Sequence, residues 1–221
     1  MLRVLLAASV ALLPAAQPSA QGPGQIPAAP ARSLTLAQVW TLNGTYNDPQ
    51  HGVLFRYPAV WQATTQFAYH PPALTQSNVA KPIAAFEYSE GGFPRKQLVG
   101  PYGGTNLEGV SLVYSAVPAA SFAECGAKAA SVSGSPNGLP VRFGERSFSV
   151  YETESAGMSQ STSGKLYATY TGSTCYLFET DVAVVSPGVV DNIQALTPAQ
   201  LSFIESHLMD IIKSVQIVEV H

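Results

Sequence analysis

Few side chains in this sequence are placed so that they could perform catalysis. The four histidines are His51, His70, His207 and His221, and no two of them have the spacing of zinc ligands. Residues 157–161 (GMSQS) approach the G-x-S-x-G nucleophile motif but lack its second glycine. The sequence therefore predicts no catalytic residue, no metal site and no cofactor. It leaves open a hydrolase site assembled from residues that are distant in the chain.

Acidic side chains give two weaker indications of chemistry. Asp48 and His51 lie three residues apart, but the Asp-Pro step that follows Asp48 is typical of a turn, so we interpret this stretch as a loop rather than a metal pair. Five carboxylates in predicted strands could include an acid–base pair: Glu87, Glu152, Glu154, Glu179 and Asp181. Because side chains alternate along a strand, we expect these carboxylates to face solvent.

A long glycine- and proline-rich segment, residues 90–105, is the best candidate for a contact surface. Residues 100–109, GPYGGTNLEG, overlap the end of this segment and resemble a phosphate-binding loop. However, they lack the terminal Lys-Ser/Thr and precede a predicted strand rather than a helix. We therefore interpret the segment as a partner-contact loop. Its contact residues would be Phe93, Arg95, Lys96 and Tyr102.

The two cysteines, Cys125 and Cys175, predict a disulfide bond if the chain is exported. The loop between them has about 50 residues, and closing it would contribute roughly 4 kcal/mol in the chain-entropy description. A catalytic cysteine is the less favoured interpretation, because an oxidising compartment would block the thiol.

The amino-terminal residues indicate export. Residues 1–20 contain Arg3, an apolar run and then small residues, which is the pattern of a secretory signal peptide. The apolar run is about half as long as a membrane-spanning helix, so no membrane span is expected. Residues 21–33 are rich in Pro, Ala and Gly and are expected to form a flexible leader. We therefore expect a secreted or periplasmic protein with one domain, residues 34–221.

The charge composition makes some classes of partner less expected than others. The formal net charge is −3, and only 11% of the residues are charged. The sequence has no basic block, so nucleic acid is not an expected partner.

The spacing of apolar residues predicts the strands and helices that would position these side chains. Alternating apolar residues predict strands over residues 53–57, 62–69, 82–89, 110–117, 141–143, 147–153 and 214–220, and a hairpin of 165–170 with 175–182. Capping signals predict two helices, one from Ser121 to about Ala130 and one that begins at Thr197-Pro198. Strands outnumber helices and follow one another along the chain. This predicts an α+β domain with helices packed on an antiparallel sheet.

Residues 46–61 carry a resemblance to a known family. They read Y-x-D-x-x-H-G-V-x-F-x-Y-P-x-x-W, which resembles the opening of PsbP-like and Mog-like domains. An aromatic pair in a strand (Tyr176, Phe178), an amphipathic helix and a closing S-V-x-I strand then follow in the order of that family. The resemblance implies an α/β/α sandwich and a role in binding rather than catalysis. It supplies no metal or partner residue that could be transferred to this chain.

The sequence therefore favours a non-enzymatic domain that binds an unknown protein partner or a small ligand. An extracytoplasmic hydrolase is the main alternative, and an apolar-ligand carrier is a weaker one. Within residues 51–61, we expect Val53, Phe55 and Tyr57 to face the core. We expect Pro58 to end the strand and Trp61 to cover the sheet end, with its indole N–H bound to a nearby acceptor.

Overall fold

The computed structural model describes residues 33–67, 69, 71–89, 100–157, 159–186, 188–189 and 192–218. Most of the predicted contact loop, including Phe93, Arg95 and Lys96, lies outside these residues. The elements follow in the order α1 (Leu36–Trp40), β1 (Gly44–Asp48), β2 (Val53–Tyr57), β3 (Gln62–Ala63), α2 (Ala73–Gln76), β4 (Ala84–Ser89), β5 (Leu107–Pro118), α3 (Phe122–Ser133), β6 (Leu139–Phe143), β7 (Arg146–Ala156), β8 (Gln160–Thr171), β9 (Thr174–Val185), α4 (Pro198–Lys213) and β10 (Gln216–Ile217).

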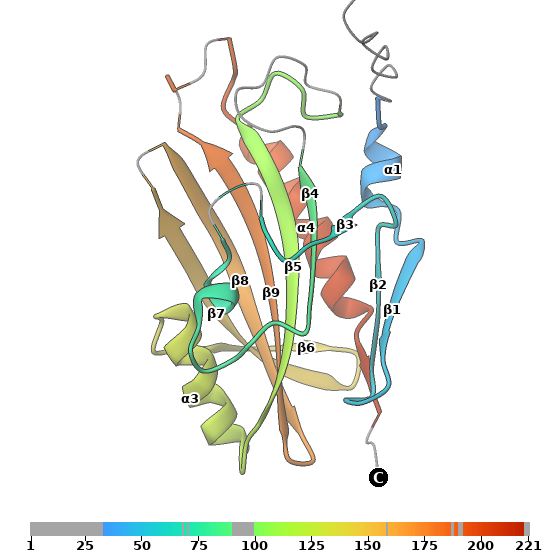
Figure 1. The fold of residues 1–221 in the computed structure, drawn as a ribbon, viewed down its shortest axis with the longest axis vertical. Coiled ribbons are helices and arrows are strands. Elements are labelled where there is room, and N and C mark those ends of the chain that lie inside the picture. Colours follow the sequence, from blue (N-terminus) through green and yellow to red (C-terminus); the bar gives the residue numbers. More distant parts are fainter. Residues whose placement is uncertain are drawn as a thin grey trace, which may run out of the picture. The chain divides into compact units, whose positions relative to one another are not determined.

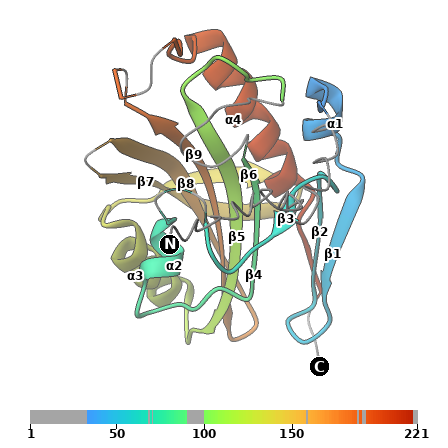
Figure 2. The ribbon, with the colours of Figure 1, turned by 45° about the horizontal axis from the view of Figure 1, so that its top comes forward.

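Two antiparallel sheets form the framework of the fold (Figure 1). The larger sheet has seven strands in the order β3-β4-β5-β9-β8-β7-β6, and the smaller has the order β1-β2-β10. Figures 1 and 2 show α4 on one side of the larger sheet and α2 and α3 on the other. This arrangement confirms the predicted α+β class.

Strand β9 lies in the middle of the larger sheet and is covered on both faces. Its even-numbered side chains, such as Phe178 and Val182, belong to the apolar cluster that contains α4 and the smaller sheet. Its odd-numbered side chains, such as Cys175 and Leu177, belong to a second cluster that contains α3. The strand is buried along nearly its whole length, so alternation leaves it no solvent-facing side.

The two predicted helices are confirmed with their caps. Helix α4 begins with the capping box of Thr197 and Gln200, and it buries Ile204, Leu208, Ile211 and Ile212. In α3, the Ser121 side chain accepts a hydrogen bond from the Glu124 amide, and the helix ends at Gly134 in the left-handed conformation.

The predicted disulfide is confirmed, because Cys125 and Cys175 are bonded to each other with their Cα atoms 5.2 Å apart. It joins the first turn of α3 to the start of β9. The predicted β8–β9 hairpin is also confirmed, with Gly172 at a φ of 61° in its turn.

The expectations for residues 51–61 also agree with the structure. Val53 and Phe55 are fully buried, whereas Tyr57 is half-buried. Strand β2 ends before Pro58, and the Trp61 indole N–H donates to the Val39 carbonyl at 3.0 Å. Val53, Phe55 and Trp61 of this stretch therefore belong to the core.

Other predicted boundaries were wrong. Among the described residues of 62–69, only Gln62–Ala63 form a strand, and among those of 214–218, only Gln216–Ile217 do; positions 219 and 220 of the predicted closing strand lie outside the described residues. The short helices α1 and α2 and the strand β1 were not predicted. Isolated helices of four or five residues are not stable, so tertiary contacts must hold α1 and α2.

Candidate functional site

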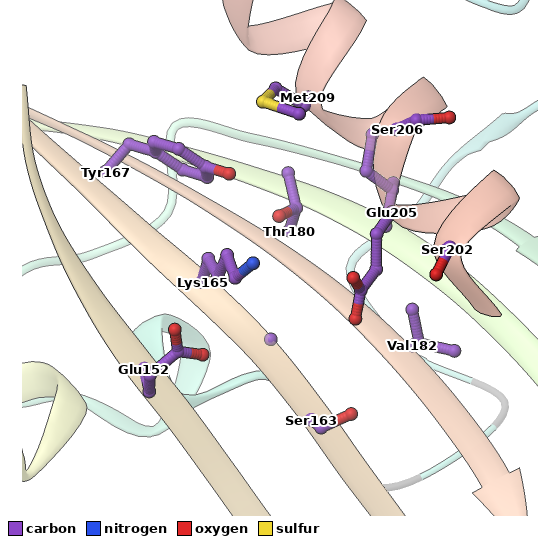
Figure 3. Close-up of a pocket in the computed structure, with 12 residues that line it drawn as sticks. Glu152, Ser163, Lys165, Tyr167, Thr180, Val182, Ser202, Glu205, Ser206 and Met209 are labelled. Carbon is purple, nitrogen blue, oxygen red and sulfur yellow. The ribbon is translucent and has the colours of Figure 1, made fainter. Parts of the chain in front are cut away.

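A cavity of about 190 Å³ opens between α4 and strands β7, β8 and β9. Figure 3 shows its side chains, which come from the sheet below and from the helix above. It is lined by Glu152, Ser163, Gly164, Lys165, Tyr167, Thr180, Val182, Ser202, Glu205, Ser206, Leu208 and Met209.

Strand register brings the polar groups of the cavity floor together. In the two hairpins, Lys165 lies opposite Glu152 on β7 and opposite Thr180 on β9. Residues directly opposite one another in an antiparallel sheet point to the same face, so these three side chains form one row. Lys165 is therefore the central residue of the floor, and Figure 3 shows its ammonium directed into the space between the sheet and α4.

Helix α4 supplies the roof of the cavity. Ser202, Glu205, Ser206 and Met209 recur at intervals of three and four residues, which places them along one side of the helix. This side is next to the buried face that carries Ile204 and Leu208. Glu205 thus provides a second carboxylate above the row of Glu152, Lys165 and Thr180.

The pKa of Tyr167 reflects its burial and the negative charge in the cavity. Burial, and then the negative charges of Glu152 and Glu205, raise the pKa of Tyr167 to about 12. The phenol is therefore protonated at neutral pH and acts as a hydrogen-bond donor. One ammonium, two carboxylates and several hydroxyl groups consequently face a small space with one apolar side, formed by Val182, Leu208 and Met209.

The described residues of this cavity do not form a nucleophile–base pair. No hydroxyl of Ser163, Ser202 or Ser206 makes a hydrogen bond with Lys165, Glu152 or Glu205 in the part of the chain that the structure describes. Ser206 lies 3.4 Å from Nδ1 of His207, but that nitrogen also lies 2.8 Å from the Phe203 carbonyl oxygen. Nδ1 therefore serves as the donor to this carbonyl and cannot accept a proton from Ser206.

Two of the five candidate carboxylates meet on the other face of the sheet. Glu179 and Asp181 are 0% and 1% exposed, which corrects the expectation that they face solvent. They are buried because β9 is covered on both faces. Glu87 is also buried, whereas Glu152 and Glu154 are exposed as expected.

Asp48 and His51 form part of the β1–β2 hairpin. One oxygen of Asp48 accepts hydrogen bonds from the amides of Gln50 and His51, and the other lies 2.7 Å from Nδ1 of His51. The Tyr114 hydroxyl donates to Asp48 as well. These bonds agree with the interpretation of this stretch as a loop. Within the described residues, no cluster of three or more histidines, cysteines or carboxylates could hold a metal ion.

Tyr102 is the one predicted contact residue that the structure describes, and it is only 3% exposed. Its hydroxyl accepts a hydrogen bond of 2.7 Å from the indole N–H of Trp40. The expected role in surface contact is corrected for this residue, because its side chain is part of the core.

A second hollow is an aromatic groove of about 750 Å³ between the smaller sheet and the β3–β4 edge. It is lined by Tyr46, Tyr57 and Phe86 and by residues from the segment that contains α2. The Tyr57 and Phe86 rings are 4.2 Å apart between centroids. The lining residues carry no charge.

No helix within the described ranges has the length and apolar character needed to cross a membrane.

Comparisons with known proteins find weakly similar solved structures and no family. No family model matches the chain, and no curated protein matches it. A solved structure from Bacteroides thetaiotaomicron VPI-5482 is similar over 81% of this chain and 50% of its own, with 9% identity and a TM-score of 0.41. The chain thus spans half the length of that protein. LpqN, which is involved in cell envelope biogenesis of Mycobacterium tuberculosis, is similar over 85% of this chain and 99% of its own, with 11% identity and a TM-score of 0.41.

Proposed function

We propose that this chain is an extracytoplasmic binding domain without catalytic activity, and that it holds a small zwitterionic ligand in the cavity beneath α4. The observation that carries the proposal is the position of Lys165 between Glu152 on a neighbouring strand and Glu205 on α4. A ligand carboxylate would bind the Lys165 ammonium. A ligand ammonium would bind one or both glutamates.

The size and lining of the cavity limit the ligand. A volume of about 190 Å³ is smaller than that of most drug-binding pockets, so the ligand is of amino-acid size. The formal charges of Lys165, Glu152 and Glu205 sum to −1, which disfavours a purely anionic ligand. The hydroxyl groups of Tyr167, Ser163 and Thr180 would bind its remaining polar atoms.

Export is part of the proposal. The pattern of residues 1–20 predicts a secretory signal peptide, and the Cys125–Cys175 disulfide is typical of oxidising compartments. The resemblance to PsbP-like domains also implies binding, and the helices on both faces of the sheet agree with the sandwich that this resemblance predicts. Membership of that family is likewise a proposal.

Titration calorimetry with a panel of free amino acids and betaines tests the proposal. We expect saturable binding by at least one zwitterion and none by matched carboxylic acids or sugars. A hydrogen bond to a charged group contributes about 1.5–3 kcal/mol, so Lys165→Met should weaken binding roughly tenfold or more. Glu205→Gln should weaken it as well.

Lys213→Met is the matched control, because Lys213 is on α4 but pairs with Asp210 outside the cavity. It should leave the affinity unchanged. Equal losses in the Lys165 and Lys213 variants, or no binding by any zwitterion, would contradict the proposed ligand. Turnover of an ester or amide substrate that is abolished by Lys165→Met would favour the hydrolase instead.

A further inference from the structure

The buried carboxyl groups of Glu179 and Asp181 are not used by the cavity beneath α4. They are two residues apart on β9, so both point to the opposite face of the sheet, and neither is more than 1% exposed. Each carboxylate must therefore be stabilised by groups within the protein.

Glu179 is bound to the start of α2. Its two oxygens accept hydrogen bonds from the backbone amides of Ala73 at 3.0 Å and Leu74 at 2.6 Å. Asp181 accepts hydrogen bonds from the hydroxyls of Ser111 at 3.3 Å and Thr153 at 3.5 Å. Its Oδ1 also occupies the space beside Gly164 that a Cβ atom there would need.

The neighbouring ionisable groups provide no positive charge to the pair. In the described residues, no lysine or arginine bonds to either carboxylate. The groups around the pair are Glu87 on β4, Glu108 on β5, Tyr151 on β7 and Tyr69. On α3, which contacts α2, Lys128 and Glu124 pair with each other at 3.1 Å.

Ionising both carboxyl groups at once has a high free-energy cost, because they are adjacent, buried and without a neighbouring positive charge. Burial and the charge of Glu179 raise the pKa of Asp181 well above its usual value, and burial also raises the pKa of Glu179. A proton on Asp181 allows it to donate to Glu179. Glu179 then remains an anion that accepts the two amides of α2.

The anchored segment also forms one wall of the aromatic groove. Residues 71–83 contain α2 and supply Thr75, Pro82 and Ile83 to the groove, which Tyr46 and Tyr57 also line. Figure 2 shows α2 beside α3 over the larger sheet. The bonds from Glu179 to α2 therefore connect the buried pair to the groove wall.

We propose that Glu179 and Asp181 form a proton-dependent latch on residues 71–83, which holds this wall of the aromatic groove while the pair keeps a shared proton. When the proton passes to solvent, two buried negative charges repel each other, and α2 detaches from β9. The groove then loses the part of its wall that Thr75 of α2 forms, whereas Ile83 stays bound to the Tyr114 carbonyl of β5 through its amide.

The direction of the effect follows from linkage. The closed state binds more protons than the open state wherever the pH lies between the open-state and closed-state pKa values of the pair. The opening equilibrium therefore rises about tenfold per pH unit in that range and levels off above the closed-state pKa. The stabilisation is complete at low pH and is lost as the pH rises.

Hydrogen–deuterium exchange of the full chain between pH 5 and 9 tests the latch, with rates corrected for intrinsic exchange. In the wild type, we expect protection of residues 71–83 to fall about tenfold per pH unit, while protection of α4 stays constant. Asp181→Asn keeps a donor to Glu179 but has no charge to gain, so it should remove the pH dependence. Glu154→Gln, at an exposed carboxylate of β7, is the matched control and should behave as the wild type.

Constant protection of residues 71–83 across this range in the wild type would overturn the proposal, as would the same slope in Asp181→Asn. If Asp181→Asn does not fold, Glu179→Gln replaces it. This variant should show weaker protection of residues 71–83 at every pH, because one capping acceptor is lost. Its slope should lie at lower pH than in the wild type, because Asp181 is still buried but no longer faces the charge of Glu179. A slope at the wild-type pH in Glu179→Gln would equally overturn the latch.

Discussion

At the scale of single residues, Tyr102 shows how a loop residue in the sequence can belong to the core. It lies within the glycine- and proline-rich segment 90–105, which predicted a surface contact. In the structure, it accepts the indole N–H of Trp40 in a site where both side chains are at most 5% exposed. The sequence contained no signal for this bond, because the two residues are 62 positions apart.

This bond leads to a test by a single-atom change. Tyr102→Phe removes the acceptor and leaves the buried indole N–H of Trp40 without it, which costs about 1–3 kcal/mol of the free energy of unfolding. Urea denaturation of the two proteins measures the difference. Tyr57→Phe is the control, since Tyr57 is half-buried and lines the aromatic groove. A loss no greater than that of the control would contradict the assigned role of the Tyr102 hydroxyl.

At the scale of elements, local signals predicted those that carry their own capping or turn residues. Helix α4 has Thr197, Pro198 and Gln200 at its start, and the β8–β9 hairpin has Gly172 in its turn. Helix α1 also has a capping box, formed by Thr35 and Gln38, but with five residues it is too short to be stable alone, and α2 has no side-chain cap. Helix α2 starts at the two amides that Glu179 binds from 105 or more residues away, a contact that no local pattern reveals.

The floor of the cavity, which the sheet forms, could also be predicted from the sequence. Once the turn at Gly172 is placed, the β8–β9 register puts Lys165 opposite Thr180. The next hairpin puts Glu152 beside Lys165. Glu205 could not be predicted, because its position depends on how α4 packs on the sheet. For the same reason, the sequence could not show that Glu179 and Asp181 are covered.

Removal of the disulfide tests how strongly it stabilises the contact between α3 and β9. The bond closes a loop with a sequence separation of 50 between α3 and β9. The chain-entropy description gives about 4 kcal/mol for such a loop, so the double variant Cys125→Ala, Cys175→Ala should lose up to this amount of the free energy of unfolding. Chemical denaturation with and without reductant measures it, and the variant should not respond to reductant. Two titratable thiols in the unreduced, denatured wild type would contradict the bond.

At the scale of the whole described unit, aromatic side chains join the two sheets. Phe55 on β2 is fully buried, and its ring lies within 6.2 Å, between centroids, of those of Phe86, Tyr114 and Phe178 on the larger sheet. Tyr46 on β1 packs against Phe55 as well. Only 11% of the residues are charged, and the described part of the chain forms few ion pairs, so apolar packing of this kind must supply most of its stability.

The position of Phe55 predicts that the two sheets unfold together. Phe55→Ala opens a cavity at their junction and should cost about 3–5 kcal/mol of the free energy of unfolding. Phe122→Ala is the matched control, because Phe122 is 53% exposed at the start of α3, and it should change stability far less. Calorimetry of both variants should show one transition, with the midpoint lowered strongly only in Phe55→Ala. Two separate transitions in Phe55→Ala would mean that the smaller sheet unfolds on its own. This outcome would show that the Phe55 ring couples the two sheets, whereas two transitions in the wild type would contradict the prediction.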